Sequence, residues 1–253
     1  MTDYRPAELM VAAAAREIRD GETVFVGMRL PLIAFALAKQ THAPAAVGVF
    51  EAGLVRDQPA PELLYTMGDP ANVAGSIWAT GLWEVMSLLQ RGEVDLGFIG
   101  GAEVDRRGNL NTSYIGDPAH PRVKLPGSGG AADIAALSRR FVVIMQHDPR
   151  RLRERVDYIT SPGYGDGPGW RQRVGLCGGG PSTLITTLGV FGFENGEAVL
   201  RSYHPFTTVE EVEAGTGWQL RTVTDVQPTP EPTREELAII RAYDPHGFWT
   251  GHT

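Results

Sequence analysis

The order of apolar and polar positions predicts a strand–helix–strand unit near the start of the chain. Thr23–Val26 is a short β-branched and aromatic run, Leu30–Ala38 is apolar with few β-branched residues, and Val47–Phe50 is a second apolar run. An alanine-rich stretch at 6–19 precedes this unit and favours a helix that stops at Asp20-Gly21. Because helical crossovers join strands of the same direction, we expect a parallel sheet.

The rest of the chain extends the same plan. Further helices are expected at 81–91 and from the capping boxes Thr208–Glu211 and Thr233–Glu236, and strands at 95–102, 141–146 and within 183–203. Glu194-Asn195-Gly196 predicts a hairpin turn. Residues 54–76 carry many prolines and glycines and are expected to be irregular, as a functional or interface loop. The whole pattern predicts an α/β fold with an open, mainly parallel sheet and flanking helices, in a single domain spanning residues 1–253.

Composition and charge narrow the class of protein. The 253 residues are 42% hydrophobic and 21% charged, as in ordinary globular proteins, and the net charge of −7 disfavours nucleic-acid binding. No apolar run reaches the roughly 18–20 residues that span a bilayer. The N-terminus has no basic-then-apolar signal pattern, and one cysteine, Cys177, fits a reducing compartment. We therefore expect a cytoplasmic protein without membrane or nucleic-acid partners.

Glu51 is the first candidate for chemistry. It directly follows the predicted strand Val47–Phe50, and Gly53 comes just beyond it. In an open α/β sheet, ligands bind outside the carboxyl ends of the strands, where a carboxylate can act as a nucleophile or a base. A solvated turn residue is the commoner explanation of such a position. The position alone therefore leaves both interpretations open.

A glycine loop supplies the second candidate. Gly127-Ser128-Gly129-Gly130 leads straight into a predicted helix, and its N–H groups favour an anion or an oxyanion. The spacing fits neither the dinucleotide fingerprint nor a Walker A loop, so a tight turn that only packs a helix is an equal alternative. Asn111 follows the tight turn Asp105–Gly108 and either satisfies turn backbone or donates to a substrate oxygen.

Other catalytic classes lack their sequence patterns. The six histidines show no metal-ligand spacing, so we predict no metal site. A Gly-x-Ser-x-Gly nucleophile elbow is absent, which disfavours an α/β-hydrolase. Cys177 precedes three glycines and is interpreted as structural rather than nucleophilic.

Ten short motifs in a fixed order resemble the β subunit of the class I CoA-transferases, closest to the glutaconate CoA-transferase type. They are Val26-Gly27-x-x-Leu30-Pro31-Leu32-Ile33, His42-Ala-Pro44, Glu51-Ala-Gly53, Phe98-Ile-Gly-Gly-Ala102, Gly108-Asn-x-Asn111, Ile115-Gly-Asp117, Gly127-Ser-Gly-Gly130, Met145-Gln-His147, Asp157-Tyr-x-Thr-Ser-Pro-Gly163 and Asp166-Gly-Pro-Gly169. The resemblance covers nearly the full length and implies the CoA-transferase family I fold.

The resemblance also implies a mechanism and a partner. Glu51 matches the family's catalytic glutamate, which attacks an acyl-CoA thioester and then carries CoA as a glutamyl thioester. The loops at Gly27 and Gly127–Gly130 are plausible oxyanion donors. Coenzyme A enters as a substrate, and no tightly bound cofactor is expected. Such proteins work with an α subunit that completes the active site, and Trp78, Trp83 and the 54–76 loop are candidates for contact with it.

One departure from the family pattern concerns the substrate pocket. Gly27-Met28-Arg29 stands where relatives often have Gly-Thr-Gly or Gly-Ile-Gly. Arg29 lacks the backbone freedom of glycine and brings a cation that can pair with a carboxylate or a phosphate. The alternatives are a CoA-ester hydrolase or a ring-opening, C–C-cleaving enzyme on the same fold, acting on a carboxylated acyl-CoA, and a scaffolding subunit without chemistry of its own.

Overall fold

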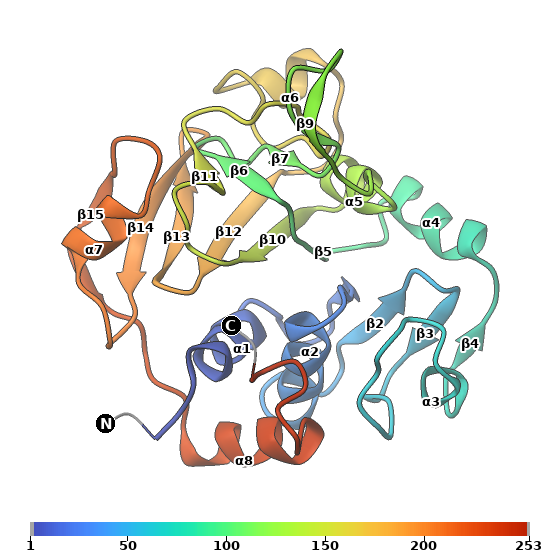
Figure 1. The fold of residues 1–253 in the computed structure, drawn as a ribbon. Coiled ribbons are helices and arrows are strands. Elements are labelled where there is room, and N and C mark those ends of the chain that lie inside the picture. Colours follow the sequence, from blue (N-terminus) through green and yellow to red (C-terminus); the bar gives the residue numbers. More distant parts are fainter. Residues whose placement is uncertain (1–2, 252–253) are drawn as a thin grey trace. The chain divides into compact units, whose positions relative to one another are not determined.

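The computed structural model describes residues 3–251, and the chain divides into two compact units. Unit 1 holds the described residues up to Phe98 together with those from Pro230 onward, and unit 2 holds Ile99–Thr229. Figure 1 follows the chain by colour, with the C-terminal helix α8 (red) returning to the N-terminal elements of unit 1 (blue). The first and the last described residues therefore belong to the same unit.

The strands of unit 1 confirm the predicted parallel pairing. β1 (Thr23–Phe25) pairs in parallel with β2 (Val47–Phe50) and with β5 (Leu96–Ile99). Antiparallel strands β3 (Leu54–Arg56) and β4 (Trp78–Ala79) continue the sheet beyond β2. Because β1, β2 and β5 run in the same direction, their carboxyl ends lie at one edge of the sheet.

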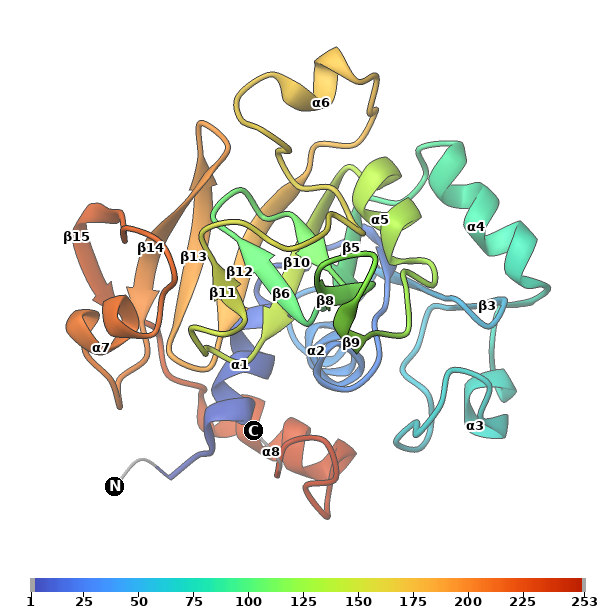
Figure 2. The ribbon, with the colours of Figure 1, turned by 45° about the horizontal axis from the view of Figure 1, so that its top comes forward.

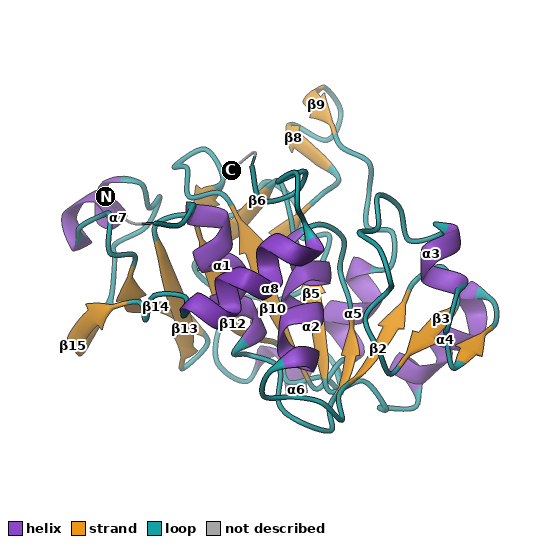
Figure 3. Cartoon of the chain, turned by 90° about the horizontal axis from the view of Figure 1, so that it is seen from below, coloured by secondary structure: helices purple, strands orange, loops and turns teal. Residues whose placement is uncertain are grey.

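Three helices of unit 1 pack against one another, as Figure 3 shows. They are α1 (Pro6–Ala15), α2 (Leu30–Gln40) and α8 (Arg234–Tyr243). Every residue of α1 except Pro6 is buried, and so is every residue of α2 except Gln40, which is typical of core helices. Ion pairs join α8 to the N-terminal part of unit 1, from Arg241 to Glu8 at 2.8 Å and from Arg16 to Glu236 at 3.0 Å.

Two expectations for unit 1 need correction. The first helix ends at Ala15 rather than near residue 19. The segment 54–76 is not irregular throughout, since it contains β3 and the short helix α3 (Pro70–Val73) and is followed by β4. The helix expected at 81–91 is present as α4 (Leu82–Gln90).

Unit 2 combines parallel and antiparallel strands, which lie side by side in Figure 2. Its main sheet contains β10 (Arg140–Met145), β12 (Pro181–Thr186), β13 (Gly189–Glu194), β14 (Glu197–Tyr203) and β15 (Thr222–Pro228). β10–β12 and β14–β15 are parallel, whereas β12–β13 and β13–β14 are antiparallel. The predicted hairpin turn is confirmed between β13 and β14, where Asn195 and Gly196 both take positive φ values of 53° and 73°.

Shorter elements complete unit 2. One small sheet is formed by β6 (Glu103–Asp105), β7 (Leu110–Asn111) and β11 (Leu152–Arg153), and another by β8 (Tyr114–Gly116) and β9 (Pro121–Lys124). The helices are α5 (Ala131–Leu137), α6 (Trp170–Arg173) and α7 (Val209–Ala214).

The capping boxes and the fold class are as predicted. The side chains of Thr208 and Thr233 accept hydrogen bonds from Glu211 and Glu236 at the starts of α7 and α8. The strand pairings and the helices confirm an α/β fold with an open, mainly parallel sheet and flanking helices, to which each unit adds antiparallel pairs. Among the described residues, no helix has the length and apolar character to cross a membrane.

Candidate active site

Glu51 occupies the first position of the loop that leaves β2. The loop is short, because Phe50 pairs with Leu54 across the β2–β3 hairpin and the amide of Gly53 donates to the carbonyl of Phe50 at 3.0 Å. Gly53 has a φ of 92°, the glycine conformation that closes three-residue hairpin loops. Glu51 is half-buried at this loop, as expected for a side chain at the carboxyl end of a parallel strand.

Backbone packing fixes the loop from its other side. A Cβ atom on Gly53 would lie 2.2 Å from the carbonyl oxygen of Thr80, and the amide of Thr80 donates to the Gly53 carbonyl at 2.7 Å. No side chain fits between these two backbones. The glycine two residues after Glu51 is therefore required by a close approach as well as by the turn, and together they define the path of the loop that carries the carboxylate.

Gly27 lies at the end of the neighbouring strand. The amide of Val26 donates to the carbonyl of Val49 at 2.9 Å, so β1 and β2 stay paired up to the residues before Gly27 and Glu51. Paired strands lie about 4.8 Å apart, which makes Gly27 and Glu51 neighbours at the same edge of the sheet. A Cβ atom on Gly27 would approach the carbonyl of Phe98 to 3.0 Å, so this position also favours glycine.

Arg29 has an unusual backbone conformation next to this edge. It is the N-cap of α2, with φ 71° and ψ −121°, and the Leu32 amide donates to its carbonyl at 3.1 Å. For a residue with a Cβ atom such a conformation costs about 1–3 kcal/mol and is concentrated at functional sites. The guanidinium lies over the ring of Trp249, 5.4 Å from its centroid. Arg29 thus stands where a glycine is common, and its backbone has a conformation that glycine would take without strain.

The start of α2 adds a favourable field for anions. α2 spans Leu30–Gln40, with Pro31 in its first turn, and begins directly after Gly27, Met28 and Arg29. The N-terminus of a helix carries a partial positive charge and unpaired N–H groups. Together with the exposed Arg29 side chain, it makes this edge of unit 1 electrostatically suited to a carboxylate or to an oxyanion.

Asn111, expected as a substrate donor, is occupied by protein groups within unit 2. Its side chain is fully buried, and its amide nitrogen donates to Glu103 Oε2 and to the carbonyl of Tyr114, both at 2.7 Å. Its side-chain oxygen accepts from the amides of Ser113 and Tyr114. The structure therefore favours the other interpretation, in which Asn111 satisfies turn backbone.

The glycine loop of unit 2 is a shaped turn. Gly127 and Gly129 have φ values of 97° and 49°, and Gly130 is the N-cap of the seven-residue helix α5. The amide of Gly127 donates to the carbonyl of Thr112 at 2.8 Å, and the carbonyl of Ser128 accepts from Ala131 at 3.0 Å. The N–H of Gly127 is thus already engaged by protein backbone. A substrate-binding role of the Ser128–Gly130 segment stays a prediction.

The sequence pattern gives no signal for Trp249, the aromatic residue that contacts Arg29 from more than 200 positions away. Of the two C-terminal histidines, His246 belongs to the same segment, and His252 lies outside the described residues. Within the range 3–251, no group of three or more His, Cys, Asp and Glu side chains is placed to hold a metal ion.

Comparison with known proteins relates this geometry to a family. Residues 7–215 match the coenzyme A transferase family. The chain is 39% identical over 248 residues to the B subunit of 3-oxoadipate CoA-transferase from Pseudomonas knackmussii, an alignment covering 96% of this chain and 95% of the relative. It is 36% identical over 248 residues to the B subunit of glutaconate CoA-transferase from Acidaminococcus fermentans, covering 95% of this chain and 91% of that protein.

Crystal structures show the same similarity in three dimensions. Glutaconate coenzyme A-transferase from Acidaminococcus fermentans superimposes with a TM-score of 0.91 at 33% identity, covering 98% of both chains. The decarboxylase AibA/AibB superimposes with a TM-score of 0.85 at 31% identity, covering 97% of both chains. From the family match and these full-length similarities, we conclude that the chain belongs to the coenzyme A transferase family, as a class I β subunit.

Proposed function

We propose that this β subunit moves CoA between an acyl-CoA and a carboxylic acid through a glutamyl-CoA thioester on Glu51. The observation that carries the proposal is the position of Glu51. It begins a tightly fixed loop at the carboxyl end of β2, beside Gly27 at the end of β1. Ligands of open α/β sheets bind at such an edge, and a carboxylate on a fixed loop can be positioned against a bound thioester.

The first half-reaction loads CoA onto the enzyme. The Glu51 carboxylate attacks the thioester carbonyl, and collapse of the tetrahedral intermediate breaks the C–S bond, which gives a mixed anhydride and CoA thiolate. The thiolate then attacks the glutamyl carbonyl of that anhydride. The donor leaves as its carboxylate, and Glu51 is left as a glutamyl-CoA thioester.

The second half-reaction runs the same steps in reverse. The acceptor carboxylate attacks the glutamyl thioester and releases CoA thiolate, which forms a new mixed anhydride. The thiolate attacks the acceptor's acyl carbonyl, so that the new acyl-CoA leaves and the Glu51 carboxylate is regenerated. No net proton, electron or water is consumed, and the donor acid departs before the acceptor reacts. Ping-pong kinetics follow from this order.

Each tetrahedral intermediate carries an oxyanion that needs preorganised donors. In unit 1, we assign this role to the backbone N–H groups of Gly27 and Met28, with Arg29 as a nearby cation. Support comes from the close packing of Gly27 on Phe98 and from the start of α2 at the same edge. In unit 2, the Ser128–Gly130 loop stays a prediction as a substrate-binding segment.

The second part of the proposal concerns the partner. Both CoA-transferase relatives carry the name of one subunit of a larger enzyme, which supports an α subunit in a heterodimer or a higher αβ oligomer. Unit 1 exposes a group of large apolar side chains around α3, β4 and α4, which we call the 73–83 surface: Val73, Ile77, Trp78, Leu82 and Trp83. Trp83 is 84% exposed, which is costly for a tryptophan unless something covers it. We assign this surface to contact with the α subunit.

Three further features complete the proposal: the role of coenzyme A, the domain organisation and the compartment. Coenzyme A is a substrate rather than a resident cofactor, and residues 1–253 act as one β-subunit domain. The cytoplasm is the proposed compartment, supported by the single, exposed, free cysteine Cys177.

A second candidate function is C–C bond cleavage on the same fold. The similarity to the decarboxylase AibA/AibB favours it, since that structure superimposes nearly as well as the transferase. Glu51 would then be a base or idle, and no CoA would become attached to the protein. The two functions therefore differ in whether Glu51 is covalently modified during turnover.

Exchange kinetics test the transferase proposal. The chain is co-expressed with its α subunit, and CoA exchange is measured between labelled acids and their CoA esters. Glu51→Gln should abolish exchange, because an amide is a poor nucleophile and cannot form the thioester. Glu235→Gln is the matched control, an exposed glutamate in the first turn of α8, and should exchange at the wild-type rate. Consumption of acyl-CoA that persists in Glu51→Gln would contradict the transferase mechanism.

A further inference from the structure

The segment after α8 is folded into a fixed loop around one carboxylate. Asp244 is 3% exposed, and its two oxygens accept hydrogen bonds from the amides of Phe248, Trp249 and Thr250 at 2.7, 3.0 and 2.9 Å. The hydroxyl of Thr250 adds a fourth at 3.0 Å. A buried carboxylate with four donors fixes the backbone of all three residues, so the direction of the Trp249 side chain is set by this loop.

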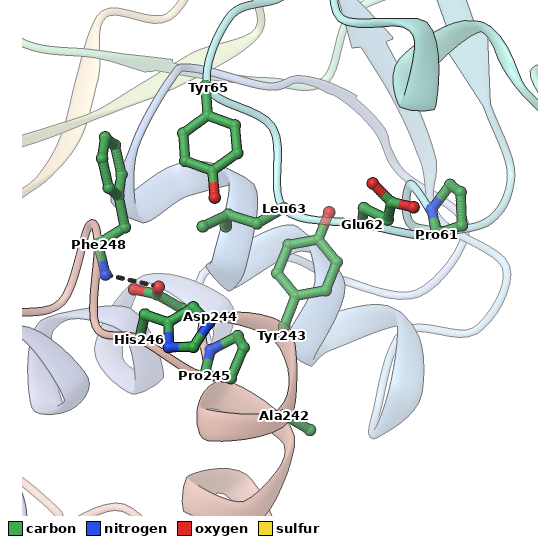
Figure 4. Close-up of a pocket in the computed structure, with 10 residues that line it drawn as sticks. All are labelled: Pro61, Glu62, Leu63, Tyr65, Ala242, Tyr243, Asp244, Pro245, His246 and Phe248. Carbon is green, nitrogen blue, oxygen red and sulfur yellow. Dashed lines mark hydrogen bonds between the residues drawn. The ribbon is translucent and has the colours of Figure 1, made fainter.

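Trp249 is held from a second element as well. Its indole N–H donates to the carbonyl of Leu64 at 2.9 Å, and its ring meets Phe248 edge to face at 4.6 Å between centroids. Phe248 in turn contacts Tyr65 edge to face at 4.7 Å. In Figure 4, Phe248 and Tyr65 lie at one end of a pocket of about 280 Å³ that separates the 61–65 loop from the end of α8. Trp249 is thus anchored through both its ring and its N–H.

The face of this anchored ring supports Arg29. The guanidinium carbon lies 5.4 Å from the ring centroid, within the range of a cation–π contact. Arg29 itself is exposed and has the positive φ described above, so the fold accepts a strain to place an arginine there. An exposed arginine side chain otherwise samples many rotamers, and a fixed aromatic platform reduces that freedom.

We propose that Trp249 is a positioning residue of this enzyme, which holds the Arg29 guanidinium at the Gly27–Glu51 edge so that it can bind an anionic oxygen group of the substrate. This inference rests on the proposed function for the identity of the substrate. The anionic group is a carboxylate or a phosphate, supplied either by the far end of the acyl chain or by the CoA moiety. The platform acts by keeping the guanidinium oriented, so that less entropy is lost when the anion binds.

A binding cycle tests the pairing. Dissociation constants of acyl-CoA are measured by calorimetry on the αβ complex for Arg29→Gln, Trp249→Leu and the double variant. Trp249→Leu should weaken binding about fivefold, the size of one lost exposed cation–π contact, and Arg29→Gln about tenfold or more. Because Trp249 acts through Arg29, the leucine change should have almost no further effect in the Arg29→Gln background. Multiplied effects in the double variant would overturn the proposal.

Two further variants separate positioning from folding. Trp249→Phe keeps an aromatic face but loses the donor to Leu64, so it should retain most of the affinity that Trp249→Leu loses. Trp218→Phe, a buried tryptophan of unit 2, is the matched control and should bind as the wild type does. Thermal melting of each complex shows whether the fold is intact. Equal losses in Trp249→Phe and Trp249→Leu at unchanged melting temperature would contradict a role for the ring face.

The choice of CoA ester identifies the anion. A CoA ester with a distal carboxylate is compared with one of equal length that ends in a methyl group. If the acyl carboxylate is the partner, Trp249→Leu weakens only the first ester, and if a CoA phosphate is the partner, both weaken equally. Unchanged affinity for both esters would refute the inference. Binding does not require the glutamyl thioester, so a failure of the Glu51 mechanism would leave these results readable.

Discussion

At the level of single residues, the proposed chemistry depends on Glu51 and Arg29, and the structure supports the two for different reasons. Nothing in the local sequence around Glu51 distinguishes it from a solvated turn residue, and its proposed role follows from the strand end where it lies. Arg29 differs from Glu51 because its own backbone is strained, with a positive φ at the start of α2. Strain of this kind is concentrated at functional sites. Such strain persists only where the surrounding structure holds the backbone, and here Arg29 caps α2 and its carbonyl accepts from the amide of Leu32.

The strain at Arg29 can be measured with a pair of variants. Arg29→Gly and Arg29→Ala both remove the guanidinium and its contact with Trp249, but only glycine accepts a φ of 71° without steric cost. We expect Arg29→Gly to be more stable than Arg29→Ala by about 1 kcal/mol, despite the greater chain entropy of unfolded glycine. Urea unfolding of the two variants gives the comparison. An alanine variant that equals or exceeds the glycine variant would show that the backbone is not strained.

Two buried histidines of unit 2 make stability depend on pH. Burial lowers the pKa of His147 and of His204 to about 4. The Nδ1 atom of His147 lies 3.0 Å from the Thr186 hydroxyl, and the Nε2 atom of His204 lies 2.8 Å from the Thr186 carbonyl. The unfolded chain binds these protons near pH 6.5, whereas the folded chain does so only near pH 4. Stability is therefore complete above pH 6.5 and falls as the pH drops toward 4, by about 2 kcal/mol per histidine at pH 5.

Unfolding midpoints at pH 7.5 and pH 5 test this expectation. His204→Gln should lose less stability between the two pH values than the wild type does, because one proton-linked group is gone. His120→Gln, an exposed histidine, should keep the wild-type dependence. A wild-type pH dependence in His204→Gln would mean that this histidine is not held neutral by burial.

Among the helices and strands, the sequence predicted those whose formation depends on neighbouring residues in the chain. The strand before Glu51, the helix that begins at Leu30, the Asn195-Gly196 hairpin and the two threonine caps were all predicted, because each depends on residues close in sequence. The segment after Glu51 was not. β3 is only three residues long, and its side chains are buried by contacts that no sequence window contains.

Arg56 shows why that segment was missed. An arginine among prolines suggests an exposed loop, yet Arg56 is 2% exposed. Its guanidinium donates to four backbone carbonyls, two just after it in the chain (Gln58 and Pro59) and two at α3 (Asn72 and Ala74). These carbonyls converge on one guanidinium only in the folded chain, so the burial of this charge is a tertiary effect that sequence patterns do not report.

Removal of the Arg56 side chain should be strongly destabilising. Arg56→Ala leaves a cavity and several buried carbonyls without donors, and we expect a loss of about 3 kcal/mol in the free energy of unfolding. Arg56→Lys keeps the charge but lacks the planar fork, so it should recover only part of this loss. Arg91→Ala, an exposed arginine at the end of α4, is the control and should be nearly neutral. Urea denaturation provides the values, and a neutral Arg56→Ala would contradict a structural role.

At the scale of the molecule, the sequence predicted the family but not the long-range contacts of the candidate site. Motifs spread over nearly the full length predicted the family, and the family match confirms it. The hydrogen-bond partners of the Asn111 side chain and of the Gly127 amide were harder to predict, since the sequence looks the same whether these groups bind substrate or protein. The contact of Trp249 with Arg29 could not be predicted at all, because the two residues lie far apart in the sequence.

The 73–83 surface provides a test of the assembly. Trp83→Asp places a charge at its most exposed residue, and we expect the αβ complex to dissociate at concentrations where the wild type is intact. Trp83→Phe keeps an aromatic side chain and should remain in the complex. Size-exclusion chromatography with light scattering reports the assembly state. Co-elution of Trp83→Asp with the α subunit at wild-type affinity would show that the partner binds elsewhere.

The most direct test of the central claim is peptide mass spectrometry of the αβ complex, quenched in acid during turnover with an acyl-CoA. We expect the peptide containing Glu51 to gain the mass of CoA minus one water, hydroxylamine to release the CoA and leave a hydroxamate, and Glu51→Gln to show no addition. Turnover at full rate with the Glu51 peptide unmodified, or with CoA attached at a different residue, would rule out a glutamyl-CoA thioester on Glu51.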